Sequence, residues 1–483
     1  MDSILQLPWT PIYKQETCEL PTSSDDIMGY YALAFTVLFT VLVFGFEALI
    51  DARQRVANQI TEFPKQLETV VNKIDADRSS AKKKDGADKK DDETLLSQLQ
   101  AKFEKAQLYG ADKIMFSIVS SIYDTIETVW FLMLGFLPYA WDMAVDIGKS
   151  RMPFGKTVES EIGITMIFLL LVQVIGMVTS FPFEVYSTFH IEKKHGFNKQ
   201  TFRLFVTDKV KSTILSFVIG GPVIAALLYI IKNSGPYFYI YVWAFMFVFS
   251  VIMMTIVPVF IMPLFNKYEP LPDGVLKDRI FALAKQINYP LNKLFVMDGS
   301  KRSSHSNAFM FGFGSNKRIV LFDTLIEQVT EDEILAILGH ELGHWKLGHT
   351  LTNFAVTQCY FGAAFYCFSL CYNSTDLYSA FGFDGASTPA IIALLLFFQT
   401  LWAPVDKVLS FVLTVFSREC EFGADRFSAD LGMSACLQSG LCKIHLENLG
   451  SMCPDWLYST YHYSHPPLVE RLSAMMEMEK KSK

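Results

Sequence analysis

The residues best suited to chemistry in this sequence are the run Gly-His-Glu-Leu-Gly-His-Trp at positions 339–345. His340 and His344 are four residues apart, so on a helix both imidazoles project from one face. Two neutral ring nitrogens at that spacing can bind one Zn²⁺, and Glu341 can act on a water as general base. An ordinary helix with two surface histidines is the alternative, and the low histidine content, nine in 483 residues, disfavours it.

A catalytic zinc normally has three protein ligands, so this motif needs a partner. The extended pattern H-E-x-x-H-x-x-G-x-x-H would place glycine and histidine where the chain has Leu347 and Thr350. His349 is one residue early and lies off the ligand face, so we interpret it as non-ligating. The third ligand must therefore come from another part of the chain.

The elements that position this motif are predicted to be membrane helices. Hydrophobic residues make up 51% of the chain and charged residues only 19%, against about 25% in a typical soluble domain. The net charge of -7 gives no sign of a nucleic-acid-binding surface. A membrane-spanning helix needs roughly 20 apolar residues. Seven stretches qualify, at about 29–46, 114–141, 162–183, 212–231, 237–265, 351–372 and 389–416.

The basic residues of the connecting segments predict an orientation. Segment 51–112 holds twelve Lys and Arg, whereas segment 373–388 holds none, and high and low counts alternate along the chain. We interpret the mixed-charge run 77–93 as a solvated, flexible part of a cytosolic insert. The expected organisation is a luminal N-terminus (1–28), five spans with the cytosolic insert 51–112 (29–265), a cytosolic protease segment (266–350), two further spans (351–416) and a cytosolic C-terminal part of the protease domain (417–483).

This topology supplies a candidate for the third ligand. The last two spans are joined by about sixteen residues, so they should be antiparallel neighbours with adjacent cytosolic ends. That brings the histidine motif close to Glu421, and Asp425, one turn further on, can accept the remaining N–H of a ligating histidine. Glu419 is the competitor, but one turn beyond it stands Gly423, which has no side chain for the accepting role.

Four ionisable residues fall inside the predicted spans: Asp124, Glu127, Asp406 and Lys407. Charged groups at membrane depth usually face a protein interior or a water-filled space. They therefore indicate an aqueous cavity among the helices. For Asp406 and Lys407, a break in the helix or a snorkelling end is the alternative.

Taken together, these residues resemble the type I CaaX prenyl proteases. Besides the histidine motif and Glu421–Asp425, matching blocks lie at 189–199, 262–266, 303–312 and 463–471, so the resemblance extends over nearly the whole chain. Cys420 and Gly423 depart from the residues more common beside the family's glutamate, and the insert 77–93 is lengthened; neither departure removes a ligand.

The resemblance implies an all-α multi-pass membrane protein with seven transmembrane helices around a water-filled chamber. A mainly helical cytosolic zinc-protease domain with a short β-segment would cap the chamber. It implies an endopeptidase with one Zn²⁺ per chain that removes the last three residues of prenylated CaaX proteins, with a second upstream cleavage in lamin-precursor-type substrates. We expect a monomer of the endoplasmic reticulum membrane, with the inner nuclear membrane as a further location, that binds prenylated substrates and lipid but no nucleic acid.

The resemblance also implies roles for three further residues. His465 would donate to the oxyanion beside the catalytic Glu341, while Asn307 and Arg471 would contact substrate. Residues 307–312 are expected to form a strand whose edge can pair with an extended peptide. A surface histidine and an ordinary strand-end asparagine are the alternatives. The tail with Lys480 and Lys481 resembles a dilysine retrieval signal, with a solvated basic tail as the alternative.

Two other functions compete with this interpretation. A membrane zinc protease for quality control would share the histidine motif and a later glutamate but normally has fewer spans. A seven-span receptor or transporter would share the topology but would give no reason for His340, Glu341, His344 and Glu421 to converge.

Overall fold

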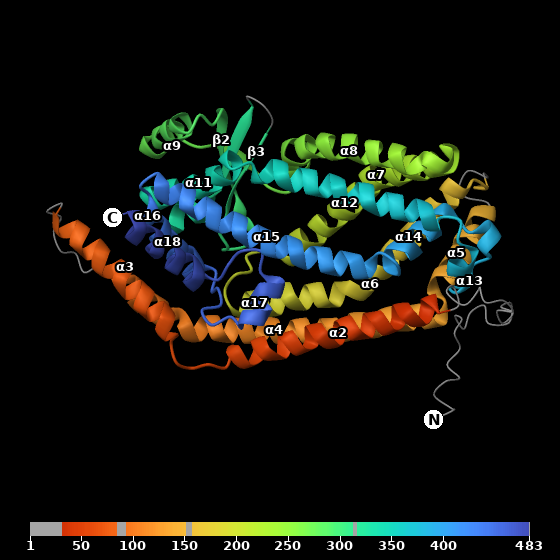
Figure 1. Cartoon of the computed structure of the whole chain (residues 1–483), viewed down its shortest axis with the longest axis horizontal. Helices are drawn as coiled ribbons and strands as arrows, with labels where there is room; N and C mark the ends of the chain where they lie inside the picture. Colours follow the sequence, from red (N-terminus) through yellow and green to blue (C-terminus); the bar gives the residue numbers. More distant parts are fainter. Residues whose placement is uncertain (1–30, 85–92, 151–156, 313–315, 483) are drawn as a thin grey trace.

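The computed structural model describes residues 31–84, 93–150, 157–312 and 316–482. Long helices fill one half of the molecule, and a small sheet with shorter helices forms the other half (Figure 1). We call these the membrane half and the protease half. The predicted luminal segment 1–28 lies outside the described residues.

Each of the seven predicted spans falls on a long helix or a helix pair of the membrane half. By length and composition, five helices could cross a membrane, or up to seven if each of two bent pairs is one span. The five are α2 (Ala32–Ala57), α6 (Glu161–Tyr186) with the π-helix η3 (Ser187–Glu192), α7 (Phe202–Asn233), α8 (Phe238–Ile256) with η5 (Val257–Ile261) and η6 (Met262–Leu264), and α12 (His349–Cys371).

The two bent pairs are α4 (Leu95–Leu134) with α5 (Phe136–Lys149), and α14 (Ala390–Gln399) with α15 (Ala403–Asp430). The first pair bends by 66° at Gly135, which has a φ of 75°, a left-handed conformation that glycine adopts readily. The second pair bends by 56° one turn before Asp406. The short helix α13 (Thr375–Ser379) lies between α12 and α14.

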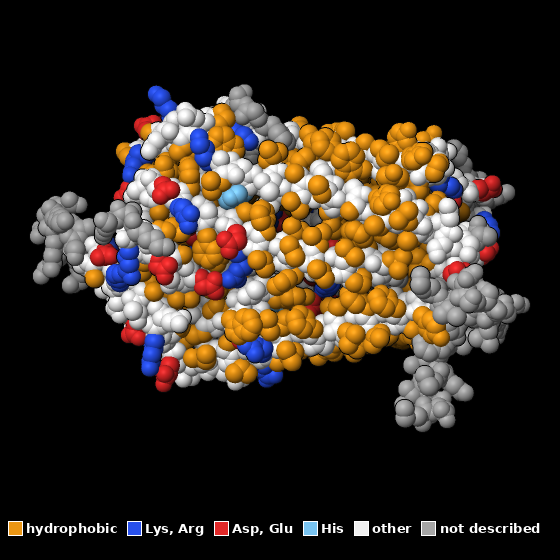
Figure 2. All heavy atoms as spheres, viewed as in Figure 1, with side chains coloured by type: hydrophobic (Ala, Val, Ile, Leu, Met, Phe, Trp, Pro, Cys, Tyr) orange, Lys and Arg blue, Asp and Glu red, His pale blue; other side chains and the backbone are white. Residues whose placement is uncertain are grey.

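Apolar side chains cover the outside of the membrane half. Leu42, Val178, Val218 and Leu351 are each more than half exposed, as side chains that face lipid are. Figure 2 shows hydrophobic side chains along this half and charged side chains concentrated over the protease half and at the opposite end. This distribution fits a protein whose long helices lie in a bilayer.

Asp406 and Lys407 each have a polar partner on another helix of the membrane half. The hydroxyl of Tyr360 donates to Asp406 at 2.8 Å, and Lys407 pairs with Glu47 at 2.8 Å. Asp406 also lines a cavity of about 500 Å³ between α12 and α15 that extends to Ser464, next to His465. The break in the last span therefore lies beside a cavity that Asp406 lines.

A four-stranded mixed sheet organises the protease half. Its strands are β1 (Tyr268–Pro270), β2 (Leu291–Met297), β3 (Ala308–Phe311) and β4 (Lys317–Phe322), in the order β1-β2-β4-β3. β2 and β4 are parallel, and β3 runs antiparallel to β4 with Ala308 opposite Leu321. The segment expected as a strand is thus β3, and it lies at the edge of the sheet.

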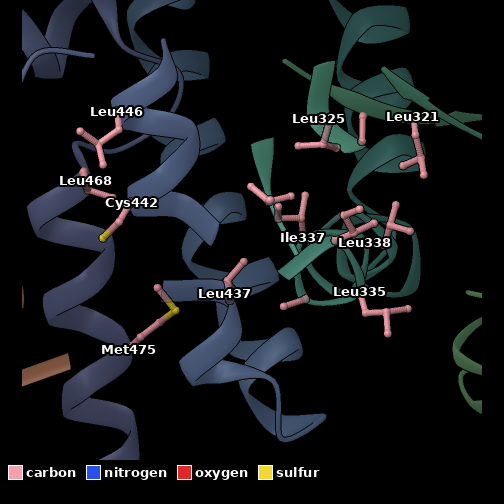
Figure 3. Packing of buried hydrophobic residues seen from close by; sticks show 14 of the residues in the cluster. Leu321, Leu325, Leu335, Ile337, Leu338, Leu437, Cys442, Leu446, Leu468 and Met475 are labelled. Carbon is pink, nitrogen blue, oxygen red and sulfur yellow. The ribbon is translucent and has the colours of Figure 1, made fainter. Parts of the chain in front are cut away.

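Apart from α17 (Trp456–His462), which packs against α2 and α15, shorter helices accompany this sheet: α9 (Val275–Gln286), α10 (Asp323–Gln328), α11 (Glu331–Lys346), α16 (Ser434–Glu447) and α18 (Leu468–Ser482). A core of buried residues joins them, and Figure 3 shows Leu335, Ile337 and Leu338 on one side of it and Leu437, Cys442 and Met475 on the other. This core fixes α11, which carries the histidine motif, inside the protease half.

The charged insert is more ordered than the sequence indicated. Residues 65–84 form α3, so the first part of the run interpreted as flexible is helical; residues 85–92 lie outside the described part of the chain. The reason is an apolar stripe at helical spacing, Leu67, Val71 and Ile74, which is buried in the core of the protease half. Asp75 accepts the backbone N–H of Leu95 at 3.1 Å, which ties α3 to the start of α4.

Candidate metal centre

Helix α11 presents the histidine motif, and its first turn is firmly anchored. Thr330 and Glu333 form a reciprocal capping box, with Thr330 N–H donating to Glu333 at 2.8 Å. The carboxylate of Glu333 is buried and accepts from Ser439 at 2.5 Å and from Lys443 at 2.8 Å, both on α16. Burial raises the pKa of Glu333, but the bonds from Lys443 and Ser439 outweigh burial and lower it. Glu333 is therefore ionised at neutral pH.

Two glycines let α15 pack closely against α11. A Cβ added at Gly343, inside the histidine motif, would lie 3.1 Å from Cβ of Phe427 and 3.3 Å from Cα of Ala424. A Cβ at Gly339 would lie 3.1 Å from Oγ of Ser428, which donates to the Ala336 carbonyl at 2.9 Å. The small residues thus bring the end of α15 against the face of α11 that carries the histidines.

This packing gathers three donor atoms. Nε2 of His340 and Nε2 of His344 lie 3.2 Å apart, and the carboxylate oxygens of Glu421 lie 3.4 Å from the first nitrogen and 3.3 Å from the second. Oε2 of Glu421 is buried and accepts no well-aligned hydrogen bond among the described residues, although Nδ1 of His465 lies 2.8 Å from it. A cation could satisfy this oxygen, so the three residues could hold one metal ion.

The electrostatics around His340 favour positive charge. Burial lowers the pKa of His340, but contacts with Asp425 and Glu421 outweigh burial and raise it to about 9. The two carboxylates can therefore stabilise a cation beside this ring. A divalent metal ion would take the place of the proton.

Asp425 holds the far nitrogen of the first histidine. Its Oδ1 lies 2.9 Å from Nδ1 of His340, and the carboxylate is fully buried. Arg471 on α18 donates two hydrogen bonds to the same carboxylate, from Nε at 2.8 Å and from Nη2 at 2.6 Å. This bidentate pair fixes the orientation of Asp425 and, through it, of the imidazole.

His349, interpreted from the sequence as non-ligating, lies outside the donor set but contacts one of its histidines. Its Nδ1 lies 2.9 Å from Nδ1 of His344. If Nε2 of His344 holds a metal, its proton is on Nδ1, which then donates to His349. The sequence offered one signal for this contact, the position of His349 about one turn beyond His344. From there its side chain can reach the second ring nitrogen of His344 without reaching the metal.

The two competing glutamates of α15 have different surroundings. Glu421 is buried beside the histidines, whereas Glu419 is exposed.

Glu341 is partly buried and has no hydrogen bond or ion pair among the described residues. Burial raises its pKa, and the positive charge of His340 and His344 partly opposes that rise. Its carboxylate is free to bind a water next to the donor triangle.

The residues expected to act on substrate lie at three places. His465 is 68% exposed, with Nδ1 2.8 Å from Oε2 of Glu421, so it stands at the open side of the centre. Arg471, expected to contact substrate, is instead buried against Asp425 and 3.4 Å from Glu421. Asn307 is exposed immediately before β3, whose Ala308–Phe311 segment contacts α11. His465 and Arg471 therefore lie directly beside the candidate metal ligands, whereas Asn307 is connected to them only through the sheet.

Two protein-family models match consecutive parts of the chain. The model described as "CAAX prenyl protease N-terminal, five membrane helices" matches residues 53–267, and the model of peptidase family M48 matches residues 270–479. An Arabidopsis thaliana protein named CAAX prenyl protease 1 homolog is 44% identical over 92% of this chain and 97% of its own length. The chain belongs to the CAAX prenyl protease family. It is therefore a membrane metalloprotease.

Other members of the CAAX prenyl protease family support this assignment. The Saccharomyces cerevisiae CAAX prenyl protease 1 is 37% identical over 92% of this chain and 95% of its own length. The human homologue is 43% identical over 78% of this chain and 86% of its own. The crystal structure of Ste24p from S. mikatae superposes with a TM-score of 0.81 at 34% identity, covering 95% of this chain and all of that one. The multi-pass helical fold expected from the sequence is confirmed.

Proposed function

We propose that this chain is a zinc-dependent endopeptidase that removes the last three residues of prenylated CaaX proteins. The observation that carries the proposal is the triangle of donor atoms from His340, His344 and Glu421, with edges of 3.2, 3.4 and 3.3 Å. Nitrogen and oxygen donors held at about 2.0–2.1 Å in a tetrahedron lie about 3.3–3.4 Å apart. The donor set, two neutral imidazoles and a carboxylate with one position left open, is typical of catalytic zinc.

Zinc bound by these residues would polarise the scissile carbonyl and make water acidic enough to lose a proton at neutral pH. Glu341 lies on α11 between the two histidines and takes that proton as general base. Attack of the water oxygen forms the new C–O bond, and the C–N bond then breaks as Glu341 returns the proton to the nitrogen of the departing tripeptide. Because Glu341 has no bond to other side chains of the described chain, it is available for both transfers.

His465 is proposed to stabilise the negative charge on the carbonyl oxygen. Its ring stands at the open side of the centre and is tethered to α18 through the Pro466-Pro467 turn, so its donor nitrogen can turn toward substrate. A donor aimed at developing charge stabilises the transition state more than the ground state.

Arg471 is proposed to position the metal ligands, because it is buried and both of its donors to Asp425 are used. The guanidinium group of Arg471, with its two hydrogen bonds, orients Asp425, and Asp425 in turn orients His340. A role in direct contact with substrate would need this side chain to leave a buried bidentate pair, which is costly.

The substrate peptide is proposed to lie along the free edge of β3. The strand is paired with β4 on one side only, and it contacts α11, so a chain added to its edge would run past the metal ligands. Main-chain hydrogen bonds at a sheet edge bind peptides with little side-chain selectivity. Asn307 stands at the start of this edge, where its exposed side chain could bind the peptide.

A direct experiment compares cleavage of a farnesylated CaaX peptide with cleavage of the same peptide lacking the lipid. We expect the purified, zinc-loaded protein to release the tripeptide from the farnesylated substrate at least tenfold faster. Equal rates for both peptides, or a protein without bound zinc, would contradict the proposal.

The cellular setting belongs to the same proposal. The domain boundaries, the cytosolic placement of the protease half and a monomeric state follow from the predicted topology. Lys480 and Lys481 on α18 support residence in the endoplasmic reticulum membrane. Imaging of the tagged protein with these lysines changed to serine would show loss from that membrane if they form a retrieval signal.

A further inference from the structure

An apolar cleft opens on the side of the membrane half, between α4 and the end of α6. Its volume is about 360 Å³, within the range of pockets that bind small ligands. The lining is mostly aromatic and aliphatic, and includes Met115, Phe116, Val119, Pro182, Phe183 and Tyr186.

The cleft is open to the surroundings of the membrane half. Val119 and Tyr186 are each 50% exposed on the bare protein, and Met115 is 40% exposed. The rings of Phe116 and Tyr186 stack at 5.9 Å, which gives the cleft a flat wall. An apolar chain could therefore enter it from a bilayer without crossing water.

One end of the cleft is polar and adjoins the protease half. Asp112 lines this end and is paired with Lys194 at 2.6 Å and His195 at 2.7 Å. A few residues on, Asn198 forms a bridge with Ser303, which belongs to the segment before β3. The cleft thus lies where the membrane half meets the peptide-binding edge.

A second cavity lies next to the cleft. Phe116 and Ile191 line both the cleft and this cavity of about 600 Å³, whose lining also includes Ser117 and Glu192. That cavity reaches Tyr463, two residues before His465, and it shares Glu192 with a further pocket that reaches His305, two residues before Asn307. The lateral cleft is therefore the first of a series of neighbouring pockets that extends toward the segments carrying His465 and Asn307.

We infer that this cleft binds the isoprenoid chain of the substrate. The inference rests on the proposed function, and it adds a place for the lipid. The isoprenoid would lie along Phe116, Val119 and Phe183, the cysteine thioether would lie at the polar end, and the peptide would extend over the neighbouring pockets toward β3. Burial of apolar surface favours binding, so an apolar cleft of this size explains why a prenyl group would strengthen binding.

The test replaces Val119 with Trp, which fills the cleft from its exposed rim without disturbing the core. Val178→Trp is the matched control, because Val178 is 64% exposed on α6 and is not among the cleft residues. With a farnesylated peptide we expect Val119→Trp to raise KM about tenfold with little change in kcat, and Val178→Trp to match the wild type. A peptide carrying the shorter geranyl chain should be affected less by Val119→Trp.

A second measurement does not depend on turnover. A peptide with a photoreactive isoprenoid should crosslink to residues 112–119 or 182–191, and Val119→Trp should reduce that labelling. The inference would be overturned if Val119→Trp left both KM and labelling unchanged. It would also be overturned if Val119→Trp displaced a phospholipid from the cleft but left KM unchanged. If the wild type cleaved no farnesylated peptide at all, the proposed function would fail; cleavage with no effect at Val119 would refute the cleft assignment alone.

Discussion

Nδ1 of His340 lies 2.9 Å from Oδ1 of Asp425, a fully buried carboxylate that Arg471 holds with two further bonds. This contact leaves Nε2 of His340 free to face His344 and Glu421. The orientation of one metal ligand therefore depends on a residue 85 positions later in the chain and on a third element, α18.

Asp425→Asn tests this dependence, because it keeps the shape of the side chain and removes its charge. We expect zinc affinity to fall about 10- to 100-fold, the effect typical of losing a partner behind a metal-bound histidine. A titration against a competing chelator measures it. Unchanged affinity would mean that the His340–Asp425 contact does not orient the ligand.

Glu421→Ala and Glu419→Ala form a matched pair on α15. The first removes a buried carboxylate of the donor triangle, so the purified protein should contain much less zinc. The second removes an exposed carboxylate, so zinc content should stay at the wild-type level. Measured metal content showing the opposite pattern would move the third ligand to Glu419.

Glu341→Gln should separate binding from catalysis. The amide cannot accept the proton of water, so we expect the cleavage rate to fall about 10²- to 10⁴-fold. Zinc content should be unchanged, because Glu341 is not part of the donor triangle. Metal analysis of the same preparation is the control, and loss of metal would assign Glu341 a structural role.

Gly343→Ala tests the close packing of α11 on α15. The new Cβ would lie 3.1 Å from Cβ of Phe427 and 3.3 Å from the backbone of Ala424, so the helices must move apart. Overpacking of this kind costs typically about 1–3 kcal/mol and should also weaken zinc binding by separating Glu421 from the histidines. Gly423→Ala is the control, since its Cβ would meet nothing closer than 3.5 Å. Equal melting temperatures and zinc affinities for both variants would contradict the packing argument.

Glu333→Gln tests the buried pair that anchors α11. The bonds from Lys443 and Ser439 lower the pKa of Glu333 below its ordinary value of 4.5. The ionised form therefore stabilises the fold above about pH 4.5, and this stability is lost as the pH falls through the lower pKa of the folded state. At pH 7 the variant should lose about 1.5–3 kcal/mol, as for hydrogen bonds to charged groups.

The melting temperature in detergent, followed from pH 7 to pH 4, measures the effect of Glu333→Gln. The gap between wild type and variant should narrow toward the acid end. Glu331→Gln, an exposed change on the same first turn, should show no such gap. A gap for Glu333→Gln that stays constant with pH would exclude the ionised carboxylate as its cause.

The sequence alone determined the parts of this protein that depend on local pattern. Apolar runs of membrane-spanning length located the five long helices and two bent helix pairs that could span a membrane, and the four-residue spacing of His340 and His344 placed both rings on one helix face. The short link between the last two spans suggested Glu421, because antiparallel neighbours bring their ends together. Local spacing and loop length carry this information without any long-range contact.

Only the tertiary structure decided the contacts between distant segments. The burial of Arg471 against Asp425, the contact of His349 with His344 and the packing allowed by Gly343 depend on how α11, α12, α15 and α18 meet. The charged insert is another case, since Leu67, Val71 and Ile74 form a stable helix because the protease half supplies a core to bury them. Such contacts have no period in the sequence, because they arise from the packing of side chains on separate elements.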